Sequence, residues 1–132
     1  MFKLNQIDHV ALTVADVQRS VAWYRDVLGL ERRHEEAWGS YPAFMYAGPT
    51  GVALFPARDP DLLPVPDHAR TAIMRHLAFQ ADHVNFLRAQ AELKQRDIAF
   101  SIEDHGISHS IYFRDPDGYE IEITTYDLKP PG

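Results

Sequence analysis

The stretches that decide the fold are residues 7–12, IDHVAL, and residues 74–79, MRHLAF. Each places a histidine, His9 or His76, in a short apolar strand with an alanine two residues later. An acidic residue and a run of helical periodicity follow in both halves of the chain. Such a repeat indicates a duplicated structural unit. Because histidine is a common metal ligand, two equivalent histidines are also half of a candidate metal site.

Apolar periodicity predicts the same order of elements in both halves, strand–helix–strand–strand–strand. In the first half we expect a strand over residues 6–14, a helix capped by Asp16, and strands over residues 30–36, 43–47 and 51–56. In the second half we expect a strand over residues 75–80, a helix over residues 82–96, and strands over residues 98–102, 109–114 and 119–125. Proline-rich residues 57–70 connect the halves.

Each half is too small to be stable alone, because about 60 residues bury only a modest share of their surface. We therefore expect a single domain over residues 1–132, made of a first module at 1–68 and a second at 69–132. The edge strands of such modules need partners, which the sister module or a second chain would provide.

The composition limits the classes of function. The chain has 132 residues, a formal net charge of −6 and no cysteine. An acidic chain without a run of Lys or Arg lacks the basic surface that binds the phosphate backbone of nucleic acids, so we expect no nucleic-acid partner. The lack of cysteine excludes disulfides, thiolate zinc sites and cysteine nucleophiles. No apolar run reaches the roughly 20 residues of a membrane span, and the first strand begins too early for a signal peptide, so we expect a soluble, cytoplasmic protein.

A hairpin near the C-terminus determines which side chains face each other. Residues 115–118, DPDG, fit a type I turn followed by a left-handed glycine, which is the usual three-residue hairpin loop. With this loop Tyr112 lies opposite Glu122, on one face of the sheet. A loop one residue longer would put the two side chains on opposite faces, because side chains alternate with period two.

The same alternation puts His9, His76, Tyr112 and Glu122 on the face away from the helices. If the sheets curl so that this face is concave, His9, His76 and Glu122 converge on one centre. Two imidazoles and a carboxylate with open positions suit a divalent metal ion that also binds a substrate. Glu120 shares the face and competes with Glu122 as a ligand. The alternative interpretation is that the histidines are hydrogen-bonded core residues.

Four side chains are candidates for proton transfer. Tyr112, beside the ion, could donate a proton or a hydrogen bond to a bound oxyanion, or it could simply fill the sheet. His68 lies in the proline-rich connector, and His105 and His109 flank a Gly-Ile-Ser loop. Each imidazole could be an acid–base group near neutral pH, and the alternative for each is a solvated loop histidine.

Four motifs together resemble the vicinal oxygen chelate superfamily, which includes glyoxalase I, extradiol ring-cleaving dioxygenases, fosfomycin-resistance enzymes and bleomycin-binding proteins. The motifs are residues 8–16, DHVALTVAD; 23–30, WYRDVLGL; 76–79, HLAF; and 115–122, DPDGYEIE. The resemblance covers nearly the whole chain. It implies an α+β fold of two βαβββ modules that form a cup-shaped mixed sheet around a metal ion. It also implies that His9, His76 and Glu122 are the ligands, commonly in a site shared across a homodimer interface.

Within the superfamily the resemblance favours the extradiol dioxygenases. Tyr112 matches a tyrosine of ring-cleaving dioxygenases and of fosfomycin enzymes. Residues 51–55, GVALF, lack the glutamate that glyoxalase I members usually carry, and Ala11 stands where fosfomycin enzymes usually carry threonine. We therefore expect a metal-dependent dioxygenase that acts on a small oxygen-chelating substrate, with His68 or His105 as the acid–base partner of Tyr112.

The expected metal is Fe²⁺, with Mn²⁺, Zn²⁺ or Ni²⁺ as alternatives, because ligand preferences overlap among these ions. Two other functions stay open. One is a fosfomycin-type or glyoxalase-type lyase, transferase or isomerase, and the other is a metal-free drug-binding protein of the bleomycin-resistance kind.

Overall fold

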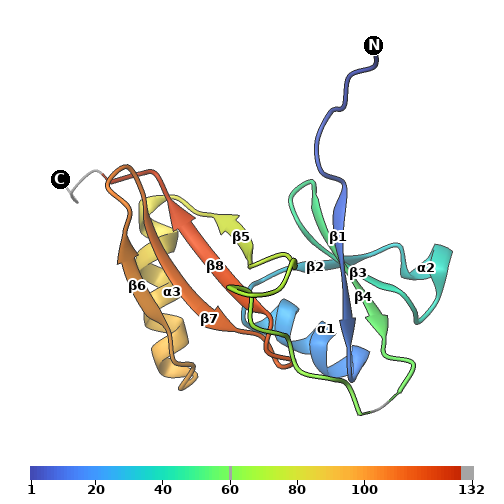
Figure 1. The fold of residues 1–132 in the computed structure, drawn as a ribbon. Helices are drawn as coiled ribbons and strands as arrows, with labels where there is room; N and C mark the ends of the chain where they lie inside the picture. The colour runs from blue at the N-terminus through green and yellow to red at the C-terminus, as the bar shows by residue number, and fades with distance from the viewer. Residues whose placement is uncertain (60, 129–132) are drawn as a thin grey trace. The chain divides into compact units, whose positions relative to one another are not determined.

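The computed structural model describes residues 1–59 and 61–128 (Figure 1). Its contacts divide the chain into two compact units, one from Met1 to Leu63 and the other beginning at Pro64. Each unit has one four-stranded mixed sheet and a helix between its first two strands. The predicted α+β class with two βαβββ modules is therefore confirmed. The single domain with modules 1–68 and 69–132 stays a prediction.

The first unit is built around the sheet β1-β4-β3-β2, in which β1 runs parallel to β4 and the other pairs are antiparallel. Its elements are β1 (His9–Val14), α1 (Val17–Asp26), β2 (Glu31–Arg33), α2 (Glu35–Trp38), β3 (Ala43–Ala47) and β4 (Thr50–Pro56). Asp16 caps α1 as predicted, because its Oδ1 accepts a hydrogen bond from the Arg19 backbone N–H at 3.1 Å. The helix buries Val17, Val21 and Tyr24 where it packs over β3 and β4.

The second unit repeats this plan with the sheet β5-β8-β7-β6. In this sheet β5 runs parallel to β8, and the other pairs are antiparallel. Its elements are β5 (Leu77–Gln80), α3 (His83–Gln95), β6 (Ser101–Asp104), β7 (His109–Arg114) and β8 (Glu120–Thr125). In Figure 1, α3 lies along one side of this sheet. Phe86 and Leu93 of α3 are buried, as are Ile111, Phe113 and Ile121 of the sheet. None of the helices in the described ranges has the length and apolar character needed to cross a membrane.

The C-terminal hairpin forms as predicted. The Gly118 N–H donates to the Asp115 carbonyl at 3.1 Å, and the Asp115 N–H donates to the Tyr119 carbonyl at 2.9 Å. Gly118 has a φ of 92°, the left-handed conformation that glycine tolerates best. Tyr112 pairs with Glu122 across β7 and β8, so the two side chains share one face of the sheet.

Several strand boundaries differ from the prediction. The strand expected over residues 6–14 begins at His9. The strand expected over residues 30–36 ends at Arg33, because His34 has a φ of 67° and the chain then enters α2. The strand expected over residues 98–102 begins at Ser101. The preceding segment completes the end of α3, where the Ile98 N–H donates to the Leu93 carbonyl at 2.9 Å. His76, expected inside a strand, directly precedes β5.

Candidate functional site

The second unit brings His76 and Glu122 into direct contact. Glu122 lies on β8 opposite Ala78 of β5, and this small side chain leaves space for the carboxylate on that face of the sheet. The Nε2 atom of His76 lies 2.8 Å from Oε1 of Glu122. Glu122 is only 8% exposed, whereas the His76 side chain is 33% exposed. The pair therefore sits at the boundary between the protein interior and solvent.

A buried hydroxyl group holds the other oxygen of the same carboxylate. Ser110, on β7, is fully buried, and its Oγ donates a hydrogen bond to Oε2 of Glu122 at 2.7 Å. The Oγ1 atom of Thr124 lies 3.0 Å from the same Ser110 oxygen. Both carboxylate oxygens of Glu122 are thus engaged, one by an imidazole and one by a hydroxyl.

Tyr112 and His105 extend this cluster along the sheet. The Tyr112 hydroxyl and His105 Nε2 share a hydrogen bond of 2.9 Å. The Tyr112 ring also meets His76 edge to face, with ring centroids 5.8 Å apart. Glu103 approaches the far side of the cluster, where its Oε2 lies 3.6 Å from His105 Nε2. The predicted side chains Tyr112, His105, His76 and Glu122 therefore form one continuous group.

The surroundings of Tyr112 raise the pKa of its phenol above the ordinary value. Burial of the hydroxyl is the largest cause, and the negative charge of Glu122 is the next, because both disfavour the phenolate. The Ser110 hydroxyl group acts on this pKa in the opposite direction and is outweighed. Tyr112 therefore keeps its proton at neutral pH and is available as a hydrogen-bond donor.

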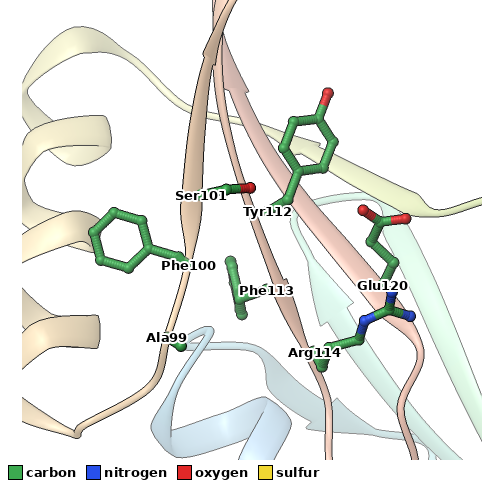
Figure 2. Close-up of a pocket in the computed structure, with 7 residues that line it drawn as sticks. All are labelled: Ala99, Phe100, Ser101, Tyr112, Phe113, Arg114 and Glu120. Atoms are coloured by element: carbon green, nitrogen blue, oxygen red, sulfur yellow. The ribbon is translucent and has the colours of Figure 1, made fainter.

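A pocket of about 300 Å³ opens beside Tyr112 (Figure 2). Its lining residues are Ala99, Phe100, Ser101, Tyr112, Phe113, Arg114 and Glu120. Arg114 is held at one side, where its Nη1 donates to the Gly118 carbonyl at 2.8 Å. Glu120 lines this pocket, whereas the contact with His76 belongs to Glu122. The geometry thus gives the two carboxylates different surroundings.

His9 begins β1 of the first unit and lies on its exposed face. Its Nδ1 contacts Oδ2 of Asp8 at 2.8 Å, and its ring meets Phe44 edge to face at a centroid distance of 5.0 Å. A Cβ atom at Gly51 would lie 3.1 Å from the His9 Cβ and 3.2 Å from the Tyr46 ring, so glycine keeps this part of the strand face open. A carboxylate on Nδ1 orients an imidazole and leaves Nε2 for a ligand.

The His76–Glu122 pair fits the chemistry and spacing of two ligands of one divalent ion. Imidazole nitrogen and carboxylate oxygen bind such ions at roughly 2.0–2.2 Å, so two of them at a right angle lie about 3 Å apart. The observed separation of Nε2 and Oε1 is 2.8 Å. Within residues 1–59 and 61–128, however, no group of three or more His, Asp or Glu side chains is arranged to hold an ion. His9 as the third ligand stays a prediction.

Two other histidines lie outside the cluster. Nδ1 of His68 is buried and has no hydrogen-bond partner among the described residues. His109 pairs with Thr125 in the register, on the face opposite Glu122, and its Nε2 lies 3.4 Å from Oδ1 of Asp104. Sequence reasoning gave Ser110 no role, although its position two residues before Tyr112 places it on the same face of β7.

The raised pKa of Tyr112 can be measured directly in the metal-free protein. The folded state holds the phenol proton more tightly than the unfolded state. The protonated phenol therefore adds to the free energy of unfolding below pH 10. This contribution is lost as pH rises through the pKa of the folded state, which is higher than that of the unfolded state. We expect the ultraviolet phenolate titration of wild-type protein minus that of Tyr112→Phe to have a midpoint above 10. A difference curve with a midpoint at or below 10 would contradict the assignment.

Comparisons with known proteins agree with this architecture. A sequence profile of the Glyoxalase/Bleomycin resistance protein/Dioxygenase superfamily matches residues 6–123. The chain is 29% identical to Glyoxylase I 4 of Arabidopsis thaliana, over 96% of this chain and 74% of that protein. It is 27% identical to metallothiol transferase FosB of Staphylococcus epidermidis, over 96% of this chain and 86% of that protein.

A solved structure shares both sequence and fold with this chain. The crystal structure of a glyoxalase/dioxygenase from Nostoc punctiforme is 30% identical, with a TM-score of 0.74, over 96% of this chain and 92% of that one. The two βαβββ units and the profile match over most of the chain lead to one assignment. The chain belongs to the Glyoxalase/Bleomycin resistance protein/Dioxygenase superfamily.

Proposed function

We propose that this protein is a metal-dependent enzyme in which His9, His76 and Glu122 hold one divalent ion. The observation that carries the proposal is the 2.8 Å contact between His76 Nε2 and Glu122 Oε1, on the same face as Tyr112. Superfamily relatives that are named as enzymes, including a glyoxylase I and a metallothiol transferase, support it. When bound, the ion would polarise the oxygen atoms of a small chelating substrate.

Tyr112 and His105 are the proposed proton-transfer pair. Tyr112 is protonated at neutral pH, as an ordinary phenol is, and its hydroxyl shares a 2.9 Å hydrogen bond with His105 Nε2. With the imidazole neutral, Nε2 accepts from the phenol, so a proton that leaves a substrate hydroxyl can be taken up along this pair. No hydrogen bond joins His68 to the cluster within the described residues, so we give the acid–base role to His105 in preference to His68.

The reaction that we propose is extradiol-type oxidation of a catecholic substrate, with Fe²⁺ as the ion. Such a substrate must lose a hydroxyl proton, and the Tyr112–His105 pair is placed to receive it. The pocket of about 300 Å³ is near the lower end of the range for small-molecule sites, which suits a single substituted ring. Phe100 and Ala99 offer it apolar surface, and Arg114 offers a positive charge.

A second candidate function is thiol transfer or isomerisation of an oxyanionic small molecule. It is favoured by the likeness to FosB, since this chain spans 86% of that protein. The same three ligands and Tyr112 would serve it, but no dioxygen would be consumed. Oxygen uptake therefore separates the two candidates.

Metal binding is the first property to measure. We expect elemental analysis to find about one divalent ion per chain. In calorimetry with Mn²⁺, His76→Ala and Glu122→Gln should each weaken binding by more than about 100-fold, since each removes a ligand. His109→Ala is the matched control, because His109 lies on the opposite sheet face. A wild-type protein that binds none of Fe²⁺, Mn²⁺, Zn²⁺ and Ni²⁺ would instead support a metal-free binding protein.

The proposed reaction is tested by anaerobic loading with Fe²⁺ followed by a panel of catechols in an oxygen electrode. We expect dioxygen uptake with at least one catechol. Tyr112→Phe should lower kcat by roughly 10²- to 10⁴-fold, the usual contribution of a positioned acid or base, with unchanged iron content. If no catechol causes oxygen uptake, and the Mn²⁺-loaded protein turns over an epoxide and a thiol, the protein is a transferase and not a dioxygenase.

We also propose that the site is shared in a homodimer, with His9 from one chain and His76 and Glu122 from the other. His9→Ala and Glu122→Gln should each bind metal poorly alone. Refolded as an equal mixture, they should recover about a quarter of the wild-type sites, because half of the dimers are mixed and each of those has one intact site. Recovery would be absent if all three ligands come from the same chain.

A further inference from the structure

Ser110 has an unusual position for a polar residue. It lies in the middle of the second sheet on β7 and is fully buried, as is its neighbour Ile111. Its Oγ lies 2.7 Å from Oε2 of Glu122. The other oxygen of this carboxylate, Oε1, is the one that faces His76 at 2.8 Å. Of the two carboxylate oxygens, the hydroxyl group therefore contacts the one that points away from the imidazole.

The direction of this hydrogen bond follows from the protons available. A serine hydroxyl has one proton, and an ionised carboxylate can only accept, so Ser110 donates to Glu122. Thr124 Oγ1 lies 3.0 Å from the same Ser110 oxygen and can itself donate to the His109 carbonyl oxygen at 3.4 Å. The Ser110 proton is thus available to Oε2, and hydrogen bonds to a charged acceptor are the stronger kind.

The first unit provides an internal comparison. Its β3–β4 pairing places Phe44 opposite Ala53, just as β7–β8 pairing places Tyr112 opposite Glu122. In the same register Ala53 and Phe55 of β4 correspond to Glu122 and Thr124 of β8, whereas β3 begins only at Ala43. The first sheet therefore forms without a polar group at either of these two positions.

Burial of a hydroxyl group and a carboxylate is unfavourable unless both are hydrogen-bonded. Because the first unit has Ala53 and Phe55 at the positions of Glu122 and Thr124, the fold itself does not require these two polar residues there. The hydrogen bond from Ser110 therefore serves the buried carboxylate of Glu122.

We propose that Ser110 is a positioning residue for the metal ligand Glu122. By occupying Oε2, its hydroxyl group fixes the carboxylate so that Oε1 alone is presented beside His76 Nε2 for the ion. Glu122 would then offer the ion one oxygen atom, Oε1. This inference rests on the proposed metal site.

The test measures the affinity of the metal-free protein for Mn²⁺ by calorimetry. Removal of the hydroxyl group in Ser110→Ala frees the carboxylate to rotate, so affinity should fall by about 10- to 100-fold, as for other partners of metal ligands. Ser110→Thr keeps a hydroxyl group and should stay within a few-fold of wild type. Ser108→Ala, which removes another buried hydroxyl group just before β7, is the matched control and should bind like wild type.

Thermal unfolding of each metal-free variant separates folding from positioning. If Ser110→Ala does not fold, Ser110→Cys fills nearly the same volume with a weaker donor, and it should bind Mn²⁺ more weakly than Ser110→Thr. Wild-type affinity in folded Ser110→Ala or Ser110→Cys would overturn the role of Ser110 and leave the metal site in place. Absence of Mn²⁺ binding by wild-type protein would overturn the proposed metal site and this inference together.

Discussion

The candidate site depends on the three-residue loop of the C-terminal hairpin. Oδ1 of Asp115 accepts hydrogen bonds from the backbone N–H groups of Asp117 and Tyr119, both at 2.9 Å, which holds the turn closed. This loop sets the register that places Tyr112 opposite Glu122. Side chains alternate between faces, so one extra loop residue would move Glu122 to the face opposite Tyr112. The chemistry of the site therefore requires this turn.

This dependence explains which parts of the structure the sequence could predict. Turn type and strand alternation are local properties, so the pairing of Tyr112 with Glu122 followed from them. The strand ends did not, because His34 and Asp97 adopt positive φ values that side chains rarely take and that no pattern indicates. Nor could alternation separate Glu122 from Glu120, since both share a face. The contact with His76 depends on the pairing of β5 with β8, which is not a local property.

The two units have kept one fold and acquired different surfaces. Around His9 the first unit is aromatic, with Phe44 at 5.0 Å and the Arg33 guanidinium 4.8 Å above the Tyr46 ring. Around His76 the second unit is polar, with a carboxylate and hydroxyl groups at positions where the first unit has Ala53 and Phe55. Duplication thus supplies two histidines at equivalent strand positions, while only the second unit has a carboxylate where the first has Ala53. That asymmetry agrees with the proposed metal site, which needs a single carboxylate.

The same asymmetry divides the proton chemistry between Tyr112 and His105. The buried, negatively charged surroundings that suit a cation beside Glu122 also raise the pKa of the Tyr112 phenol. A phenol that keeps its own proton can take a proton from a substrate only by passing its own to a base. An imidazole can act as that base. His105 Nε2, 2.9 Å from the Tyr112 hydroxyl, is the imidazole nitrogen that shares a hydrogen bond with it. The proposed enzyme therefore uses Tyr112 as the donor and His105 as the base.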